Sequence, residues 1–212
     1  SGGLTVTGDF LSAKSGAGTA AFAAGSSAGT TGQDQYAVAI GSQAGQNNQS
    51  EYAVAIGQQA GMTTQGVDAV AIGKQAGTIS QGISGVAIGE LAGTTRQGDQ
   101  GVSIGFACGN VDQGQGGIGI GVAAGQSNQG TYAIALGNLS GQTNQLANAI
   151  AIGRQAGNIS QDEYSIAIGN NAGYDTQAIN CIAIGQQAGQ ETQAAEAISI
   201  GYQAGEVSQS VH

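Results

Sequence analysis

The chain contains no proline and no tryptophan, and only nine of its 212 residues are aromatic. With six leucines besides, it carries far fewer large apolar side chains than a globular domain of this length would need. The lack of proline, and of a glycine at every third residue, excludes a collagen triple helix. Forty glycines exclude a mainly helical protein, because each glycine in a helix interior costs about 1 kcal/mol relative to alanine.

Basic residues are also scarce, since only Lys14, Lys74, Arg96 and Arg154 stand against 13 acidic residues, for a formal net charge of −9. Binding to nucleic acid requires clustered Lys and Arg, so we expect no nucleic-acid partner. No apolar run approaches the roughly 20 residues of a membrane-spanning helix, so we expect no membrane insertion. The one histidine is the terminal His212. We therefore expect no catalytic residues, no metal site, no cofactor and no enzymatic activity.

The dominant feature of the chain is a repeat of 16 residues, copied twelve times between Ala21 and His212 without insertion or deletion. A typical copy, residues 53–68, reads AVAIGQQAGMTTQGVD, and we number its positions 1 to 16. Positions 5 and 9 are glycine and position 13 is glutamine in all twelve copies. A short fixed period predicts units that stack on one another. The predicted fold is an all-β parallel solenoid, either a β-roll or a β-helix, over residues 21–212.

The residues before the repeats have a different character. Residues 1–20 are interpreted as a cloning remnant, Ser1-Gly2-Gly3, followed by an N-terminal lead-in or cap. The last copy has no capping unit, although solenoids normally need polar caps. We therefore expect the chain to be a fragment of a longer fibre.

Positions 1 to 4 predict a strand, in which alternate residues face opposite sides. Positions 2 and 4 carry bulky Val and Ile, whereas positions 1 and 3 carry Ala, Gly, Ser and Cys181. The bulky face is expected to fill the coil interior, so that Ile56, Ile72 and Ile152 point inward. The flat face of positions 1 and 3 is expected to allow another subunit to approach closely.

Positions 10 to 13, such as residues 78–81, predict a second short strand in which position 11 shares a face with the glutamine. An exposed glutamine has no reason to repeat twelve times while its neighbours vary. Stacked amides can donate and accept hydrogen bonds from coil to coil, as in cross-β ladders. The sequence thus predicts a buried structural ladder made of Gln33, Gln49, Gln65, Gln81, Gln97, Gln113, Gln129, Gln145, Gln161, Gln177, Gln193 and Gln209.

The predicted interior is thin, and this favours self-association. Burying one Val or Ile contributes about 1.5–3 kcal/mol, whereas ordering one backbone residue costs about 1–2 kcal/mol. An isolated 16-residue coil is therefore close to break-even or worse. Burial of a second apolar face between subunits would change that balance, and the simplest closed assembly of parallel rods is cyclic.

Two residue types outside this framework have competing interpretations. Cys108 and Cys181 lie more than four repeats apart, on the order of 20 Å in a stack of coils, so they are expected to be small buried fillers and not a disulfide. Tyrosines at position 16 either shield a corner or a subunit seam, or stack on sugars. These tyrosines are Tyr36, Tyr52, Tyr132 and Tyr164.

The motif Val38-Ala-Ile-Gly41, with its equivalents such as Val54–Gly57 and Ile166–Gly169, resembles repeats in the tail fibres of tailed bacteriophages and related viral fibres. It is also similar to head repeats of trimeric autotransporter adhesins, although those repeats are usually nearer fourteen residues and lack the strict Ala-Gly and Gln pattern. Both resemblances imply homotrimers of parallel β-rolls or β-helices.

The resemblance favours a structural shaft of a phage tail fibre on the virion surface, which presents or supports a receptor-binding region for host attachment. The implied partners are two further copies of the chain and a host receptor or glycan. The alternatives are a bacterial adhesin head on the cell surface and an ice-binding solenoid. Ice binding needs a regular array of threonines, and position 11 is Thr in only four copies. A membrane barrel in the full-length chain would mark the adhesin, and a baseplate-attachment region would mark the fibre.

Overall fold

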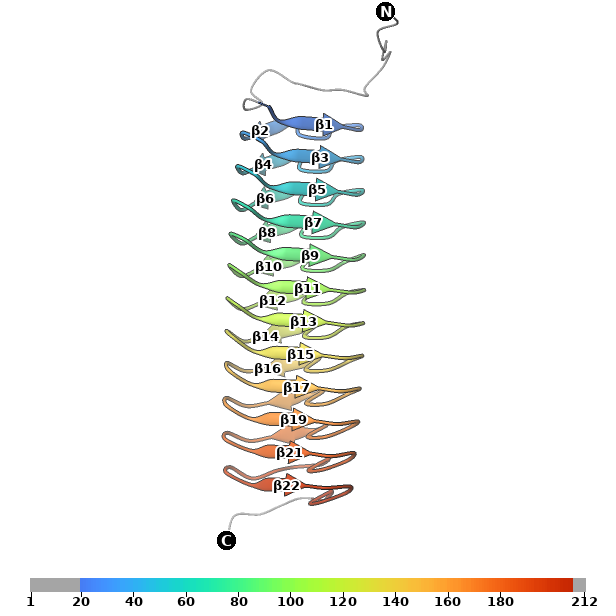
Figure 1. The fold of residues 1–212 in the computed structure, drawn as a ribbon, viewed down its shortest axis with the longest axis vertical. Coiled ribbons are helices and arrows are strands. Elements are labelled where there is room, and N and C mark those ends of the chain that lie inside the picture. The colour runs from blue at the N-terminus through green and yellow to red at the C-terminus, as the bar shows by residue number, and fades with distance from the viewer. Residues whose placement is uncertain (1–19, 208–212) are drawn as a thin grey trace, which may run out of the picture.

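The chain forms a rod of stacked coils in the computed structural model, which describes residues 20–207 (Figure 1). Each repeat makes one coil, and strands of successive coils lie side by side in two parallel sheets. One sheet has 12 strands and the other has 10. The predicted parallel β-solenoid is therefore confirmed. The lead-in assigned to residues 1–20 falls, but for Ala20, outside the described residues.

The 12-stranded sheet takes positions 2 to 4 of successive repeats. Its strands are β1 (Phe22–Ala24), β3 (Val38–Ile40), β5 (Val54–Ile56), β7 (Val70–Ile72), β9 (Val86–Ile88), β11 (Val102–Ile104), β13 (Ile118–Ile120), β15 (Ile134–Leu136), β17 (Ile150–Ile152), β19 (Ile166–Ile168), β21 (Ile182–Ile184) and β22 (Ile198–Ile200).

The 10-stranded sheet takes positions 11 to 13 and is less regular near its end. Its strands are β2 (Thr31–Gln33), β4 (Asn47–Gln49), β6 (Thr63–Gln65), β8 (Ile79–Gln81), β10 (Thr95–Gln97), β12 (Val111–Gln113), β14 (Ser127–Gln129), β16 (Thr143–Gln145), β18 (Ser160–Gln161) and β20 (Thr176–Gln177).

The register aligns equal repeat positions in neighbouring coils. Val54 pairs with Val70 and Ile56 with Ile72 in the first sheet, and Gln49 pairs with Gln65 in the second. Hydrogen bonds between coils continue around the corners. The strict 16-residue period of the sequence is thus the period of the backbone hydrogen bonding, and an insertion in any coil would break it.

Glycine is required at position 5 because of the corner that follows the first strand. The φ angle of Gly57 is +128°, and a Cβ atom placed there would lie 2.5 Å from the carbonyl oxygen of Gly73 in the next coil. Equivalent glycines in the described coils have φ between +122° and +134°. The corner therefore stacks backbone directly on backbone and leaves no space for a side chain.

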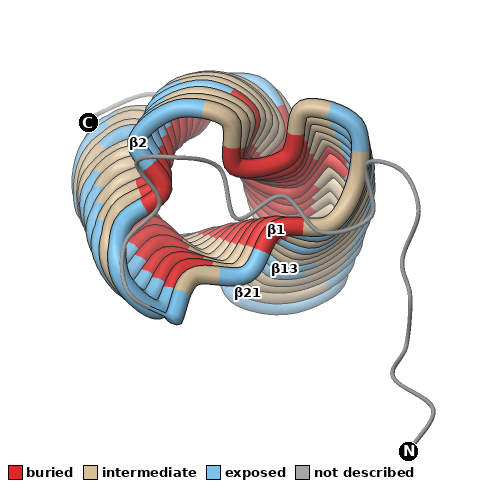
Figure 2. Tube along the Cα trace, turned by 90° about the horizontal axis from the view of Figure 1, so that it is seen from above, coloured by how far each residue is buried: buried red, intermediate tan, exposed pale blue. Residues whose placement is uncertain are grey.

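The predicted orientation of the first strand is wrong by one residue. Ala53 and Ala55, at positions 1 and 3, are 0% exposed, whereas Ile72 at position 4 is 36% exposed. Ile56 and Ile152 are half-buried and lie on the same outer side of the strand. Figure 2, coloured by residue burial, shows buried and more exposed residues alternating around the coil. The small-residue face is inside the coil, so it is not available for the subunit contact that the sequence predicted for it.

The interior is too narrow for branched side chains. A Cβ atom added to Gly61 would lie 3.2 Å from the Cβ atom of Ala55 and 2.6 Å from Oε1 of Gln65. Methyl groups and glutamine carboxamides therefore already fill the interior to contact. An isoleucine turned inward would need space that the coil does not have.

The second strand also differs from the simple alternation that was expected. From β2 to β16, position 12 has a left-handed backbone, with φ of +55° at Thr64 and +51° at Arg96. In these strands positions 11 and 13 pair between coils and position 12 does not, whereas farther along Ser160 pairs with Thr176 at position 12. The position-11 side chain is partly exposed while the glutamine is buried, so the two do not share an inner face as predicted.

Candidate functional site

The invariant glutamines form the main polar feature of the interior. All eleven from Gln33 to Gln193 are at most 2% exposed. This is the burial that the sequence predicts for these positions, while Gln209 lies outside the described residues. Each side chain starts on the second sheet or its continuation and reaches across the coil to the first sheet. The glutamines therefore link the two sheets through the core.

Each of these glutamines donates from Nε2 to the carbonyl at position 2 of its own coil. The nine from Gln33 to Gln161 also donate to the carbonyl at position 1 of the next coil. For Gln145 these acceptors are Ile134 O at 2.8 Å and Ala149 O at 3.2 Å. One amide thus joins two sheets and two coils.

The carboxamides also bond one another along the rod axis. Nε2 of Gln145 donates to Oε1 of Gln161 at 3.1 Å, and the chain of such bonds is continuous from Gln97 to Gln193. A further bond joins Gln65 to Gln81 at 3.1 Å. Among the described residues, the Oε1 atoms of Gln33, Gln49, Gln65 and Gln97 accept no hydrogen bond. The predicted ladder is therefore present but complete only in the later coils.

The glycine at position 9 is coupled to the ladder. Gly141 has a φ of +48°, and a Cβ atom added to it would lie 2.6 Å from Oε1 of Gln145 and 3.2 Å from the Cβ atom of Ala135. The glutamine carboxamide lies against the glycine backbone, so a larger residue would displace it. This contact explains why positions 9 and 13 are invariant together.

The chemistry of this site is structural. A carboxamide is neutral at ordinary pH and does not act as a nucleophile or general base, and these carboxamides are shielded from solvent. They satisfy backbone carbonyls and stabilise the stacking of coils. The row of glutamines is consequently not a surface stripe that could contact a ligand.

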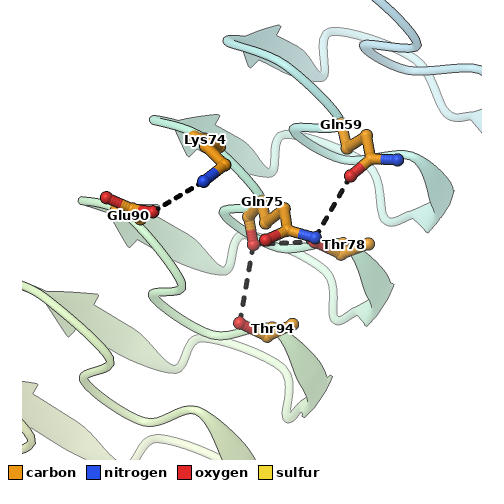
Figure 3. Close-up of polar contacts among 6 residues, drawn as sticks. All are labelled: Gln59, Lys74, Gln75, Thr78, Glu90 and Thr94. Atoms are coloured by element: carbon orange, nitrogen blue, oxygen red, sulfur yellow. Dashed lines mark hydrogen bonds and ion pairs between the residues drawn. The ribbon is translucent and has the colours of Figure 1, made fainter.

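A second set of ladders runs along the outer corners. In Figure 3, Nε2 of Gln75 donates to Oε1 of Gln59 at 3.1 Å, and Lys74 Nζ lies 3.0 Å from Oε1 of Glu90 in the next coil. On the second sheet, Arg96 of β10 pairs with Asp112 of β12 across one coil, and this hydrogen-bonded partner lowers the pKa of the Asp112 carboxyl. These pairs are solvent-exposed, so each contributes little to stability.

The position-16 tyrosines lie on the surface at the other corner. Tyr36 and Tyr52 stack with ring centroids 5.2 Å apart and an interplanar angle of 5°. Tyr132 and Tyr164 are each more than half exposed. The carboxylate of Glu51 raises the pKa of Tyr52. Whether these rings cover a subunit seam or bind sugars stays a prediction.

Both cysteines are free and buried, as the sequence predicts. The Cys108 thiol donates to the carbonyl of Ala124 at 3.2 Å, and burial raises its pKa from 9.0 to about 12. A Cβ atom on Gly119 would lie 2.7 Å from this sulfur. The larger side chain at position 8 is thus accommodated by a smaller one at position 3 of the next coil. Because a raised pKa leaves little thiolate near neutral pH, this buried thiol is expected to be a poor nucleophile.

The second sheet bears a shallow open hollow of about 230 Å³ where it becomes irregular. Asn144, Leu146, Ser160, Asp162 and Thr176 are among the residues that line this hollow. It contains no cluster of titratable groups that would indicate catalysis. Within residues 20–207 no group of three or more His, Cys, Asp or Glu is placed to hold a metal ion.

No family model, no curated protein and no solved structure matches this chain. In the part of the chain that the structure describes, no helix could cross a membrane.

Proposed function

We propose that this chain is a structural shaft segment of a phage tail fibre, which presents or supports a receptor-binding region for host attachment. The observation that supports this best is the unbroken stack of coils, in which equal positions of the first sheet pair from β1 to β22. Such a rod extends by a constant step of about 4.8 Å per repeat, so its length is set by repeat number.

The distribution of chemistry along the rod agrees with a spacer. The invariant residues all serve the coil itself: two glycines form corners and one glutamine forms the inner ladder. The outward positions vary in charge and size from coil to coil. A spacer needs a constant interior and tolerates a variable surface. The shaft acts in this proposal as a homotrimer on the virion surface, with a host receptor or glycan engaged by a region that the shaft supports.

The ice-binding alternative is not favoured by the outer surface of the second sheet. Position 11 alternates Thr31 and Thr63 with Asn47 and Ile79, so no regular threonine array is formed. The coil architecture does not distinguish the adhesin alternative from the tail-fibre shaft. The two differ in location, which is the bacterial cell surface for the adhesin and the virion for the shaft.

Immunogold labelling tests the proposal. Antibodies against residues 20–207 are expected to decorate the tail fibres of virions from the source of the chain. Label on the bacterial cell surface, with none on virions, would contradict the proposal and favour the adhesin. As a length control, deleting two whole repeats should shorten the purified rod by about 10 Å in electron micrographs.

A further inference from the structure

The outer face of the 12-stranded sheet is an apolar strip, here called the Val/Ile face. It consists of positions 2 and 4 of every coil, which together hold 23 Val, Ile, Leu or Phe side chains and one alanine. These side chains are half-buried or exposed: Ile40 is 38% and Leu136 is 41% exposed. Polar residues are absent from both rows. A soluble monomer rarely exposes a contiguous apolar patch of this extent.

The strip is large enough for a stable protein interface. Full burial of one Val or Ile side chain contributes 1.5–3 kcal/mol at about 25 cal/mol per Å², which corresponds to roughly 60–120 Å². Seven of the 23 side chains are 36–65% exposed and the others are half-buried, so the strip offers roughly 300–1,000 Å². A standard interface buries about 800 Å² on each partner.

The period of the strip indicates what covers it. Its side chains recur at the spacing of the coils, about 4.8 Å, over twelve strands or roughly 50 Å. A partner that interdigitates with every coil needs the same axial repeat. Another copy of this chain has that repeat, whereas the surface of a globular protein does not.

Charge at the two edges of the strip indicates the orientation of that copy. The corner before the first sheet, positions 14–16, carries seven acidic residues and no basic residue within residues 20–207; they are Asp34, Glu51, Asp68, Asp99, Asp162, Glu163 and Glu196. The corner after the sheet, positions 5–7, carries Lys74, Arg154 and Glu90.

Two rods in face-to-face contact bring opposite edges together when they are parallel, and like edges together when they are antiparallel. An antiparallel pair would therefore place the acidic edge of one copy against the acidic edge of the other. A parallel pair would place it against the edge where Lys74 and Arg154 outnumber Glu90, although Lys74 already pairs with Glu90. Like-charge contacts are unfavourable, so the charge distribution favours the parallel arrangement.

We infer that the Val/Ile face is the contact surface between copies of this chain, which lie parallel and at the same axial level. The inference rests on the self-association in the proposed function and names the surface that performs it. It replaces the small-residue face, which is inside the coil.

Sedimentation equilibrium of two matched variants tests the surface. Ile88→Lys with Ile152→Lys places charge on the Val/Ile face, and Ser127→Lys with Thr143→Lys places the same charge at position 11 of the other sheet. The first pair is expected to reduce the mass to that of one chain while the β-type circular dichroism spectrum is kept. The second pair is expected to keep the wild-type oligomeric mass.

The possible outcomes separate the inference from the proposed function. If both variants keep the oligomeric mass, the surface is wrong, while self-association stands. A monomeric wild type with a stable fold would overturn the inference and the homotrimer together. Neither result changes what immunogold labelling reports about the tail fibre.

Cross-linking tests the orientation. In a Cys108→Ala, Cys181→Ala background, Ile40→Cys is treated with a short bis-maleimide that reacts with two cysteines. Parallel copies bring the two introduced thiols to the same axial level, so a covalent dimer is expected. An antiparallel pair would separate them by roughly 40 Å, at about 4.8 Å per coil. Failure of Ile40→Cys to cross-link, with efficient cross-linking between co-expressed Ile40→Cys and Ile184→Cys chains, would overturn the parallel arrangement.

Discussion

Replacement of Gln145 by glutamate exchanges a hydrogen-bond donor for an acceptor at the centre of the ladder. Nε2 of Gln145 faces three oxygens: Ile134 O at 2.8 Å, Ala149 O at 3.2 Å and Gln161 Oε1 at 3.1 Å. An ionised carboxylate would present an oxygen to all three, in an interior that water does not reach. We expect the glutamate variant to be strongly destabilised at pH 7.

The alanine variant sets the scale of this effect. Gln145→Ala leaves the buried Oε1 of Gln161 without its donor, which costs about 1–3 kcal/mol. Two lost amide-to-carbonyl bonds add about 1 kcal/mol each, for a total of roughly 3–5 kcal/mol. For a chain of this size, 1 kcal/mol corresponds to about 2–4 °C in melting temperature, so we expect a fall of roughly 6–20 °C. Gln145→Glu should exceed this loss at pH 7.

The pH dependence gives the glutamate variant a distinctive signature. Burial without a donor raises the folded-state pKa of the new carboxyl above its unfolded value near 4.3. The protonated form is therefore favoured in the folded state. The loss of stability relative to the wild type is smallest below about pH 4.3 and grows as the pH rises toward the folded-state pKa. The difference in melting temperature between this variant and the wild type should shrink from pH 7 to pH 4.

Gln58→Glu is the matched control, because Gln58 is exposed at position 6, one coil from Lys74. Its melting temperature is expected to stay within about 2 °C of the wild type. Equal melting temperatures of Gln145→Glu and Gln58→Glu at pH 7 would contradict the buried role of Gln145. So would a loss of stability in Gln145→Glu that does not depend on pH.

Three further predictions concern the corners and the core. Gly153→Ala and Gly201→Ala introduce similar backbone strain, but only Gly153→Ala places a Cβ atom against the next coil, 2.6 Å from Gly169 O. Gly153→Ala should therefore lower the melting temperature more than Gly201→Ala. Equal effects of the two variants would contradict the direct stacking of backbone on backbone. Gly119→Ala is expected to lower the free energy of unfolding by about 1–3 kcal/mol through overpacking against Cys108. Adding Cys108→Ala should restore most of that stability in the double variant. Additive losses of stability in a double-mutant cycle would show that the two positions are independent. Because burial raises the pKa of Cys108, this thiol ionises at a lower pH in the unfolded state than in the folded state. Above pH 9.0 the wild type should therefore lose more stability than Cys108→Ala. If the melting temperatures of the two proteins fall in parallel across that range, the burial of the thiol is contradicted.

The sequence predicts the period, the two-strand coil and the buried glutamines because each of these features is marked by positions that are the same in every repeat. Twelve copies of Gln at position 13 admit few explanations other than a repeated internal contact. The second strand is harder to predict from the sequence, because a residue with left-handed backbone such as Thr64 breaks the alternation of side chains on which strand patterns depend.

The sequence pattern predicts the wrong orientation for the first strand because hydrophobicity alone does not decide which face turns inward. In this coil, the available volume decides it. A glutamine that crosses the interior leaves room for methyl groups only, so Ala55 turns in and Ile56 turns out. The signal was present in the sequence: the same repeat that keeps a long side chain at position 13 keeps glycine or small residues at positions 1, 3, 8 and 9.

The most direct test of this account is the exchange rate of the glutamine side-chain amides, measured by NMR on protein labelled with ¹⁵N at glutamine. The carboxamide protons of Gln145 and its equivalents are expected to exchange slowly, because they are bonded to carbonyls inside the coil. Nuclear Overhauser contacts are also expected between Gly141 and the methyl group of Ala135, which are packed together against that carboxamide. Exchange as fast as in free glutamine, with contacts from these carboxamides to isoleucine methyl groups in place of alanine, would contradict this arrangement of the core.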